Sequence, residues 1–338
     1  MLSDAHTFLE TQQTAHPFQL PEWGSGTDSY YFVVRESGQI RAFARCDTLW
    51  PLGKGLDRIR ALALARGPVC DDRALMQQSL LLLAELCRSH RYAYLDVNPD
   101  YANADAHELG SWLTGNRWFP VGSPRVSLRV DLRPEVEIIR ASFRKTTRAE
   151  IRRAGDSGVE ISEGHDEESR EKFLRLYRSM AREKQFAPDQ DAHMRQVLSW
   201  MATSPKRGVL LCASFEGELL GGVVALRAAS RSWYVWGATK KHAAVNVGHL
   251  LQWEAMKWAK RQGCLEYDLG GYRENATDGP ALFKRGFSET VVRFLPVFRF
   301  VTDTLRYPLV RLASNSVRGA RMALSTISRK SVRLRTAQ

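Results

Sequence analysis

The chain has 338 residues and a net charge of +12. This length exceeds the usual size of one hydrophobic core and predicts two domains. With 44% hydrophobic and 25% charged residues the composition is that of a globular protein, and no apolar run approaches the ~20 residues that cross a bilayer. The first ten residues include Asp4 and Glu10 and lack a basic segment before an apolar one. We therefore expect no secretory signal and a cytoplasmic location.

In chain order, the first half begins with a β-hairpin. The segments 30–35 and 39–45 alternate around an ESG turn. A helix follows at 71–91, with acidic residues at its start, an apolar stripe and basic residues at its end. The unit is completed by a strand at 92–97, a short helix near 106–113 and a closing strand near 125–132.

The second half repeats that order of elements. Three strands, an amphipathic helix that stops at a glycine, and a further strand are expected at 208–215, 219–228, 232–238, 248–263 and 265–269. Short segments occupy equivalent positions in the two halves. YLDVN (94–98) in the first half corresponds to YDLGG (267–271) in the second, and WLTGNRWF (112–119) corresponds to ALFKRGF (281–287). The sequence therefore predicts an α/β (α+β) protein made from a duplicated unit.

This duplication predicts a first domain at 1–135, a second at 136–303 and a tail at 304–338. The tail contains eight Lys or Arg and no acid, which predicts a polyanionic partner. Its apolar residues are interleaved with arginines. Contact with an anionic membrane surface, contact with tRNA phosphates and a disordered solubilising end are the alternatives.

A basic helix is expected between the two units, within residues 142–158. On a helical wheel one face is apolar or small, and consists of Phe143, Thr147, Ile151 and Ala154. The opposite face is cationic, and consists of Arg144, Lys145, Arg148 and Arg152. This cationic face is either solvated or a phosphate-binding surface, because guanidinium groups match phosphate geometry.

Common catalytic and metal-binding motifs are missing. The sequence has no GxxxxGK[ST] loop, GxSxG elbow, HExxH pair or GxGxxG turn after a strand, and no two histidines stand at metal-binding spacing. The five cysteines are odd in number and far apart, which argues against disulfides and a CxxC metal site. We expect no metal, and we interpret the cysteines as small buried hydrophobic residues.

Two features resemble a known family. These are the tandem units, of which only the second closes with FKRGF, and the helix end LYRSMAREKQF. They resemble the Fem family of aminoacyl-tRNA-dependent transferases, within the GNAT superfamily of acyltransferases. The resemblance covers about residues 20–300. It implies two tandem GNAT-like domains, each with a mixed, mainly antiparallel sheet flanked by helices.

The resemblance also implies an activity and a set of site residues. The family transfers an amino acid from aminoacyl-tRNA, without a cofactor, to the amine of a peptidoglycan precursor. We therefore expect a phosphate-bearing acceptor, free or lipid-linked, and the alternatives are a peptidoglycan-precursor-like, another cell-envelope or a small-molecule acceptor. The family's catalytic Phe-Lys pair falls on Phe283 and Lys284, where the ammonium would stabilise an oxyanion. Arg182 would meet the diphosphate of the acceptor, with Tyr177 on a neighbouring turn. Peripheral contact with the inner face of the membrane, through the tail, is a further expectation.

Further candidates lie near these residues. Gly270 and Gly271 open a loop that lets a ligand approach the backbone, and they fit the family pattern. Asp268, at a strand end, either accepts a proton from the attacking amine or caps a turn. Tyr234 and Trp236 alternate along a strand, which predicts that both face one side and line the acceptor channel or the core.

One departure keeps other functions open. The acyl-CoA loop [RQ]xxGx[GA] of ordinary GNAT enzymes is missing, since Val245 stands where the Arg or Gln should be. Acyl-CoA is therefore a disfavoured donor, although amides at a helix start can still cradle a pyrophosphate. The first alternative is an acyl-CoA-dependent N-acyltransferase in envelope or exopolysaccharide assembly. The second is a non-catalytic lipid or nucleic-acid binding module.

Overall fold

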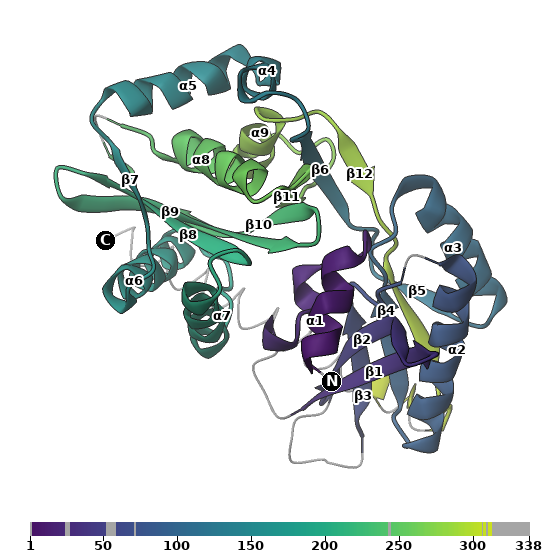
Figure 1. Cartoon of the computed structure of the whole chain (residues 1–338). Helices are drawn as coiled ribbons and strands as arrows, with labels where there is room; N and C mark the ends of the chain where they lie inside the picture. Colours follow the sequence, from purple (N-terminus) through teal and green to yellow (C-terminus); the bar gives the residue numbers. More distant parts are fainter. Residues whose placement is uncertain are drawn as a thin grey trace.

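The chain forms two mixed sheets, each flanked by helices (Figure 1). The computed structural model describes residues 2–23, 28–51, 59–70, 72–242, 245–305, 307–308 and 310–312. The expected α/β class is confirmed. Most of the basic tail, from residue 313 to the end, lies outside the described residues.

The first sheet has six strands, in which β3 and β4 are parallel and the other neighbours antiparallel. Their order is β1 (Ser29–Glu36), β2 (Gln39–Leu49), β3 (Ala61–Ala65), β4 (Tyr94–Asn98), β13 (Val297–Val301) and β5 (Phe119–Val121). The helices α2 (Arg73–Ser89) and α3 (Asn103–Gly115) pack on one face. Asp72 begins α2 by accepting the backbone N–H of Leu75.

The second sheet has seven strands, of which β10 and β11 run parallel. Their order is β12 (Val291–Arg293), β6 (Val126–Asp131), β11 (Glu266–Gly271), β10 (Arg231–Thr239), β9 (Glu218–Ala228), β8 (Gly208–Phe215) and β7 (Glu160–Glu163).

Four long helices cover this sheet on both faces (Figure 1). One face packs against α5 (Lys145–Asp156) and α8 (Gly248–Arg261). The other packs against α6 (Glu167–Lys184) and α7 (Asp191–Thr203). The short helix α9 (Gly279–Arg285) follows β11 and carries the FKRGF segment.

The two units exchange their closing strands, which corrects the expected organisation. β6 was expected to close the first unit, but it pairs with β11 and β12 in the second sheet. β13 pairs with β4 and β5 in the first sheet. The boundaries at 135 and 303 therefore do not separate the sheets. Alternating apolar residues specify a strand and its buried face, but not the sheet that it joins.

The expected basic helix forms as α5, and a further short helix, α4 (Val136–Ser142), precedes it. The face predicted to be buried is buried, with Phe143, Thr147, Ile151 and Ala154 each at most 3% exposed. It packs in the same core as α8. The helix is therefore anchored to the second sheet by its apolar face.

A further apolar cluster joins the two domains. It combines α1 (Leu2–Thr11), through Ala5 and Leu9, with Phe43 of β2 and Trp233 of β10. All five cysteines are free and buried, as expected. Within the part of the chain that the structure describes, no helix is both long and apolar enough to cross a membrane.

Candidate active site

The strands β10 and β11 separate partway along their length, and this gap locates the candidate site. Their parallel register covers only residues 231–233 and 266–268, although both strands continue beyond it. On its other side β10 stays paired with β9 to Thr239. The register of that ladder shifts between Tyr234 and Trp236. Bulges of this kind often lie next to active sites because they redirect side chains.

Lys284 lies at this separation. Asp278 caps α9 by accepting the backbone N–H of Ala281, so the helix carries Lys284 back toward the end of β11. The Nζ atom of Lys284 donates to the carbonyl of Gly271 at 2.7 Å and stands 5.7 Å from the centre of the Tyr234 ring. The ammonium group of Lys284 therefore places a positive charge where β10 and β11 diverge.

Burial changes the acid–base behaviour of this lysine. It lowers the pKa of Lys284 to about 8, and the nearby charge of Asp268 opposes that shift. At pH 7 most of the population still carries the charge. A partly desolvated ammonium interacts more strongly with a developing negative charge than one in bulk water does.

The two expected glycines lie beside Lys284. Gly270 has φ +74°, and a Cβ there would come within 3.1 Å of the Tyr234 carbonyl oxygen and 3.7 Å of Lys284 Nζ. A side chain would therefore be strained and crowded. Gly271 supplies the carbonyl that holds the ammonium.

Phe283 forms an aromatic wall next to the start of α8. Its ring centre is 4.7 Å from that of His249 and 5.3 Å from that of Phe287. The pKa of His249 is lowered by burial. The sequence predicts a core or surface position for His249 and no metal-binding role, but it does not predict the contact with Phe283.

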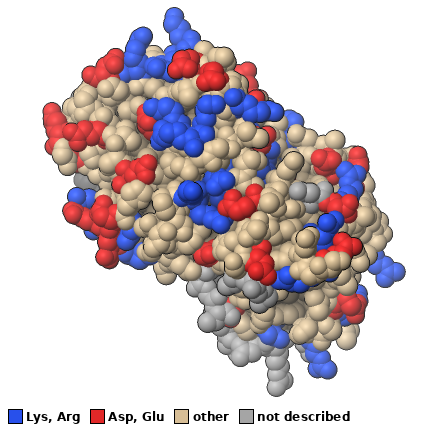
Figure 2. All heavy atoms as spheres, in the orientation of Figure 1, with Lys and Arg blue, Asp and Glu red and all other residues tan. Residues whose placement is uncertain are grey.

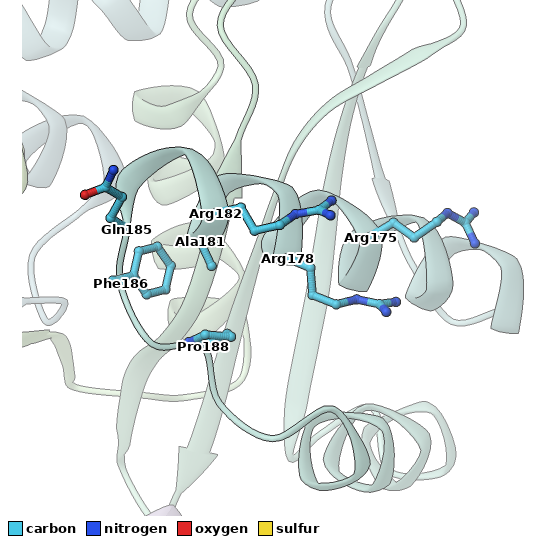
Figure 3. A pocket seen from close by; sticks show the side chains of 7 residues that line it. All are labelled: Arg175, Arg178, Ala181, Arg182, Gln185, Phe186 and Pro188. Atoms are coloured by element: carbon cyan, nitrogen blue, oxygen red, sulfur yellow. The ribbon is translucent and has the colours of Figure 1, made fainter. Parts of the chain in front are cut away.

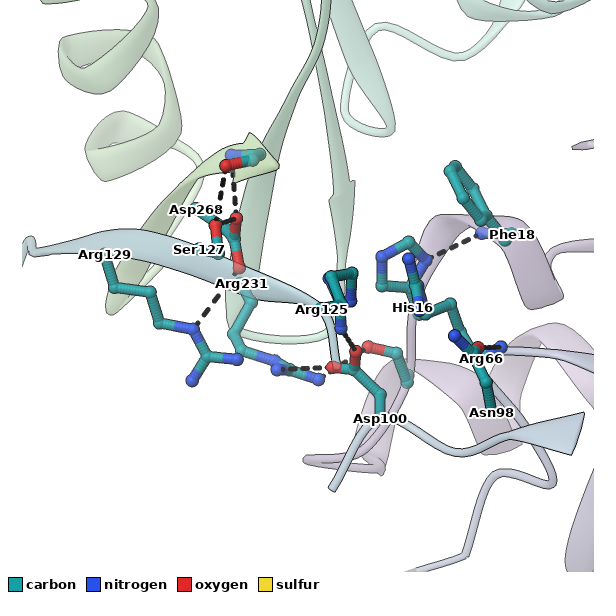
Figure 4. A network of polar contacts seen from close by, with 12 residues as sticks. His16, Phe18, Arg66, Asn98, Asp100, Arg125, Ser127, Arg129, Arg231 and Asp268 are labelled. Atoms are coloured by element: carbon teal, nitrogen blue, oxygen red, sulfur yellow. Dashed lines mark hydrogen bonds and ion pairs between the residues drawn. The ribbon is translucent and has the colours of Figure 1, made fainter. Parts of the chain in front are cut away.

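Asp268 is almost completely buried and its contacts are those of a turn cap (Figure 4). It accepts the backbone N–H of Gly270 at 2.8 Å and hydrogen bonds from Ser127 Oγ and Arg129 Nε. These contacts agree with the turn-capping interpretation. Asp268 acts on Lys284 through its charge.

Tyr234 and Trp236 lie on opposite faces of the sheet, so the expectation that they share one face is wrong. Tyr234 packs in the core between the sheet and the helices α5 and α8, whereas Trp236 packs in the core on the other face, against α6 and α7. The cause is the extra residue at Val235, which shifts the register and inverts the alternation. Tyr234 is the one of the two beside Lys284, and burial raises its pKa to about 12.

Trp236 and Tyr177 lie on the α6 and α7 side. The Nε1 atom of Trp236 donates to the Asp189 carboxylate. Tyr177 is buried and its ring centre is 5.8 Å from that of Phe186. Both residues therefore support the loop between α6 and α7.

Arg182 lines a hollow of about 620 Å³ at the end of α6 (Figure 3). Arg175 and Arg178 line the same hollow from earlier turns of the helix, with Phe186 and Pro188 beside them. Arg178 pairs with Asp191 at 3.2 Å. Among the described residues, no ion pair is found for Arg175 or Arg182. The hollow thus presents several guanidinium groups beside an aromatic ring.

The expected cationic residues of the linker helix have different roles. Arg144 pairs with Glu289 at 2.6 Å, and its backbone N–H donates to the Gly286 carbonyl just after α9. Arg148 donates to the carbonyls of Ala141 and Phe143 and so caps the end of α4. Lys145 is exposed. Figure 2 shows Lys and Arg side chains gathered on this face of the second domain, with acidic side chains between them.

Comparison with known proteins gives a family match to the middle part of the chain, which includes α5 to α9. Residues 141–285 match the model of a family described as an acetyltransferase (GNAT) domain. Over 173 residues the chain is 24% identical to UDP-N-acetylmuramoylpentapeptide-lysine N(6)-alanyltransferase of Weissella viridescens, covering 50% of this chain and 51% of the relative. The chain thus spans about half the length of this curated relative.

Solved structures with the same fold cover nearly the whole chain. The crystal structure of FemX has a TM-score of 0.80 at 16% identity, covering 93% of this chain and 98% of the other. A tandem GNAT protein from the clavulanic acid biosynthesis pathway has a TM-score of 0.54 at 12% identity, covering 89% and 94%. These likenesses confirm the expected fold of two tandem GNAT domains.

Proposed function

We propose that the chain is a Fem-like acyltransferase of the GNAT superfamily that moves an amino acid from aminoacyl-tRNA to the amine of a phosphate-bearing acceptor. The observation that carries the proposal is the position of Lys284. Its partly buried ammonium is bonded to Gly271 where β10 and β11 separate.

This arrangement suits the transfer of an acyl group from an ester to an amine. The amine attacks the ester carbonyl carbon, and negative charge builds on the carbonyl oxygen. The ester C–O bond then breaks, the tRNA ribose hydroxyl leaves, and the amine releases a proton to give an amide. Lys284 would stabilise the oxyanion, while Phe283 keeps water from one side of the site. No cofactor or metal enters these steps.

The start of α8 supports aminoacyl-tRNA over acyl-CoA as donor. A pyrophosphate would need free backbone amides in the first turn. There, the Asn246 side chain accepts the N–H of Gly248 at 3.2 Å. A Cβ at Gly248 would lie 3.7 Å from the Phe283 ring, so this ring occupies the adjacent space. Val245, at the position of the missing Arg or Gln, is buried.

The hollow at the end of α6 supports a phosphate-bearing acceptor. Guanidinium groups bind phosphate oxygens in pairs, and Arg182 is available for this. The curated relative acts, by its name, on the lysine of a UDP-N-acetylmuramoylpentapeptide. We place the acceptor of this chain in the same class, peptidoglycan precursors, free or lipid-linked. The enzyme would then work in the cytoplasm, with its basic tail at the inner face of the membrane.

A second candidate is an acyl-CoA-dependent N-acyltransferase, because the matched family is described as an acetyltransferase domain. Incubation of the protein with charged tRNA pools and with acyl-CoAs in parallel separates the two. We expect loss of the aminoacyl ester only when acceptor is present, and no loss of acyl-CoA. Consumption of acyl-CoA alone would replace our proposal by the second candidate. Tight tRNA binding without consumption of either donor would point to a non-catalytic binding module.

A further inference from the structure

A cluster of buried charges lies between the two sheets and is not used by the proposed function (Figure 4). At its centre is Asp100, just after β4, whose side chain is fully buried. Asp100 accepts from Arg125 at 2.5 Å and from Arg231 at 2.9 Å. Arg66 and His16 lie on the side toward the first sheet (Figure 4).

The cluster has more positive than negative charge. Burial lowers the pKa of His16 well below its usual value, so this ring is neutral. The guanidinium groups of Arg66, Arg125 and Arg231 are then set against the carboxylates of Asp100 and Asp268. Arg129, which also contacts Asp268, has its own partner in Glu266 at 3.1 Å. Apart from Lys284, which belongs to the candidate active site, the four guanidinium groups face three carboxylates, so one positive charge is in excess.

The excess is concentrated on Arg66, at the end of β3. Its Nε and Nη1 atoms are buried and have no hydrogen-bond partner among the described residues. The same is true of the Nε atom of Arg125. Burial and the charge of Arg125 lower the pKa of Arg66 to about 10. Buried donors without partners are costly, and a bound anion would satisfy them.

This surplus charge lies close to the reacting groups. Ser127 of β6 is paired with Gly271, the residue that accepts from Lys284. Arg125 stands two residues before Ser127, so it lies on the same face of the sheet as Ser127. That face also carries Asp268, to which Ser127 donates. Lys284 lies beside Tyr234 on the opposite face of the sheet, but the charge of Asp268 acts on Arg66, Arg125 and Lys284 alike. A ligand held by Arg66 and Arg125 would therefore reach Lys284 through the gap between β10 and β11.

We propose that Arg66 and Arg125 bind a carboxylate of the acceptor and thereby direct its amine to the separation of β10 and β11. This proposal rests on the proposed function for the identity of the ligand as acceptor. The single excess charge matches a monoanion, and a planar carboxylate matches the fork of a guanidinium group. The acceptor would then carry both an amine and a carboxylate, as an amino acid or a peptide does.

The test measures binding of the smallest carboxylate, without turnover. The melting temperature of the full-length protein is followed in increasing acetate at constant ionic strength, with chloride as the balancing anion. Because a ligand that binds the native state raises the melting temperature, we expect a saturable increase. Arg66→Gln should weaken the apparent acetate affinity about tenfold or more, because charge-assisted hydrogen bonds are lost. Arg66→Lys keeps the positive charge but loses the paired N–H donors of the guanidinium group. Its acetate affinity should therefore lie between those of the unmodified protein and Arg66→Gln.

Arg91→Gln is the matched control, because Arg91 also has a positive φ, 57° against 63° at Arg66, but is exposed. It should bind acetate as the unmodified protein does. If Arg66→Gln does not fold, Arg66→Lys carries the test alone. An acetate response no larger than that of chloride, or one unchanged in the Arg66 variant, would overturn the proposal. So would binding of dimethyl phosphate in preference to acetate. Failure of the donor assay would leave this result intact, so the two proposals fail separately.

Discussion

Replacing Lys284 with methionine should make the protein more stable and nearly inactive. Burial lowers the pKa of Lys284 from 10.5 to about 8, and each pKa unit corresponds to about 1.4 kcal/mol. The charged lysine thus destabilises the folded state by about 3 kcal/mol at neutral pH. Methionine removes this penalty but also the hydrogen bond to Gly271, worth about 1 kcal/mol. We expect a net stabilisation of about 2 kcal/mol.

The stabilisation expected for Lys284→Met should depend on pH, because it arises from the lowered pKa of Lys284. Below pH 8 lysine is charged in both the folded and the unfolded state, so the penalty is fully present. Between pH 8 and 10.5 the unfolded state retains the proton that the folded state has lost, so the unmodified protein gains stability as pH rises. The stability advantage of the variant, about 2 kcal/mol at pH 7, should therefore fall over this range and change sign near its upper end, because the unmodified protein gains about 3 kcal/mol.

Two assays test this reasoning on the same protein samples. Urea unfolding at pH 7 and at higher pH measures stability, and transfer of the aminoacyl group measures activity. Turnover should fall about 10² to 10³-fold, as when one oxyanion donor is removed. The control is Lys240→Met, an exposed lysine paired with Glu218, which should change stability by less than about 0.5 kcal/mol. A Lys284→Met protein that is less stable at pH 7, with a gap that does not depend on pH, would refute the argument.

Three further predictions concern the acceptor, the loop and the tail. Arg182→Gln should raise KM for the acceptor about tenfold or more and leave kcat nearly unchanged, because it removes a phosphate contact distant from the reacting bond. Gly270→Ala should lower the free energy of unfolding by about 1 to 3 kcal/mol, measured by urea unfolding, because its backbone has a positive φ and its Cβ would press on the Tyr234 carbonyl. Removal of residues 313–338 should leave a folded protein, since the buried Val310 is retained, and should abolish sedimentation with anionic vesicles at low ionic strength.

Much of the fold follows from local patterns in the sequence. The apolar stripe of α2 and the buried face of α5 obey the 3.6-residue period, and the structure has both. The acidic residues expected at the start of α2 include Asp72, which caps the helix. The grouping of Lys284 with Gly270 and Gly271 in one site was expected from the family resemblance, and in the structure Lys284 donates to the Gly271 carbonyl. These features depend on neighbours in the sequence, so a single sequence is enough to predict them.

The features that escaped prediction depend on residues far apart in the chain. The exchange of β6 and β13 leaves each strand's alternation unchanged, so the pattern cannot report it. The bulge at Val235 inverts the side-chain order within an otherwise regular strand. The cluster around Asp100 brings together segments near residues 16, 66, 125 and 231, none of which carries a local motif.

The most direct test of the account is the mass of the acceptor after a single turnover. The protein is mixed with UDP-N-acetylmuramoylpentapeptide and a radiolabelled pool of aminoacyl-tRNA, and the acceptor is isolated and analysed. We predict a mass increase of one aminoacyl residue, held by an amide that resists mild alkali, and a rate that falls about 10² to 10³-fold in the Lys284→Met variant. Transfer from acetyl-CoA in place of aminoacyl-tRNA, or aminoacyl transfer at an unchanged rate in the variant, would contradict the account.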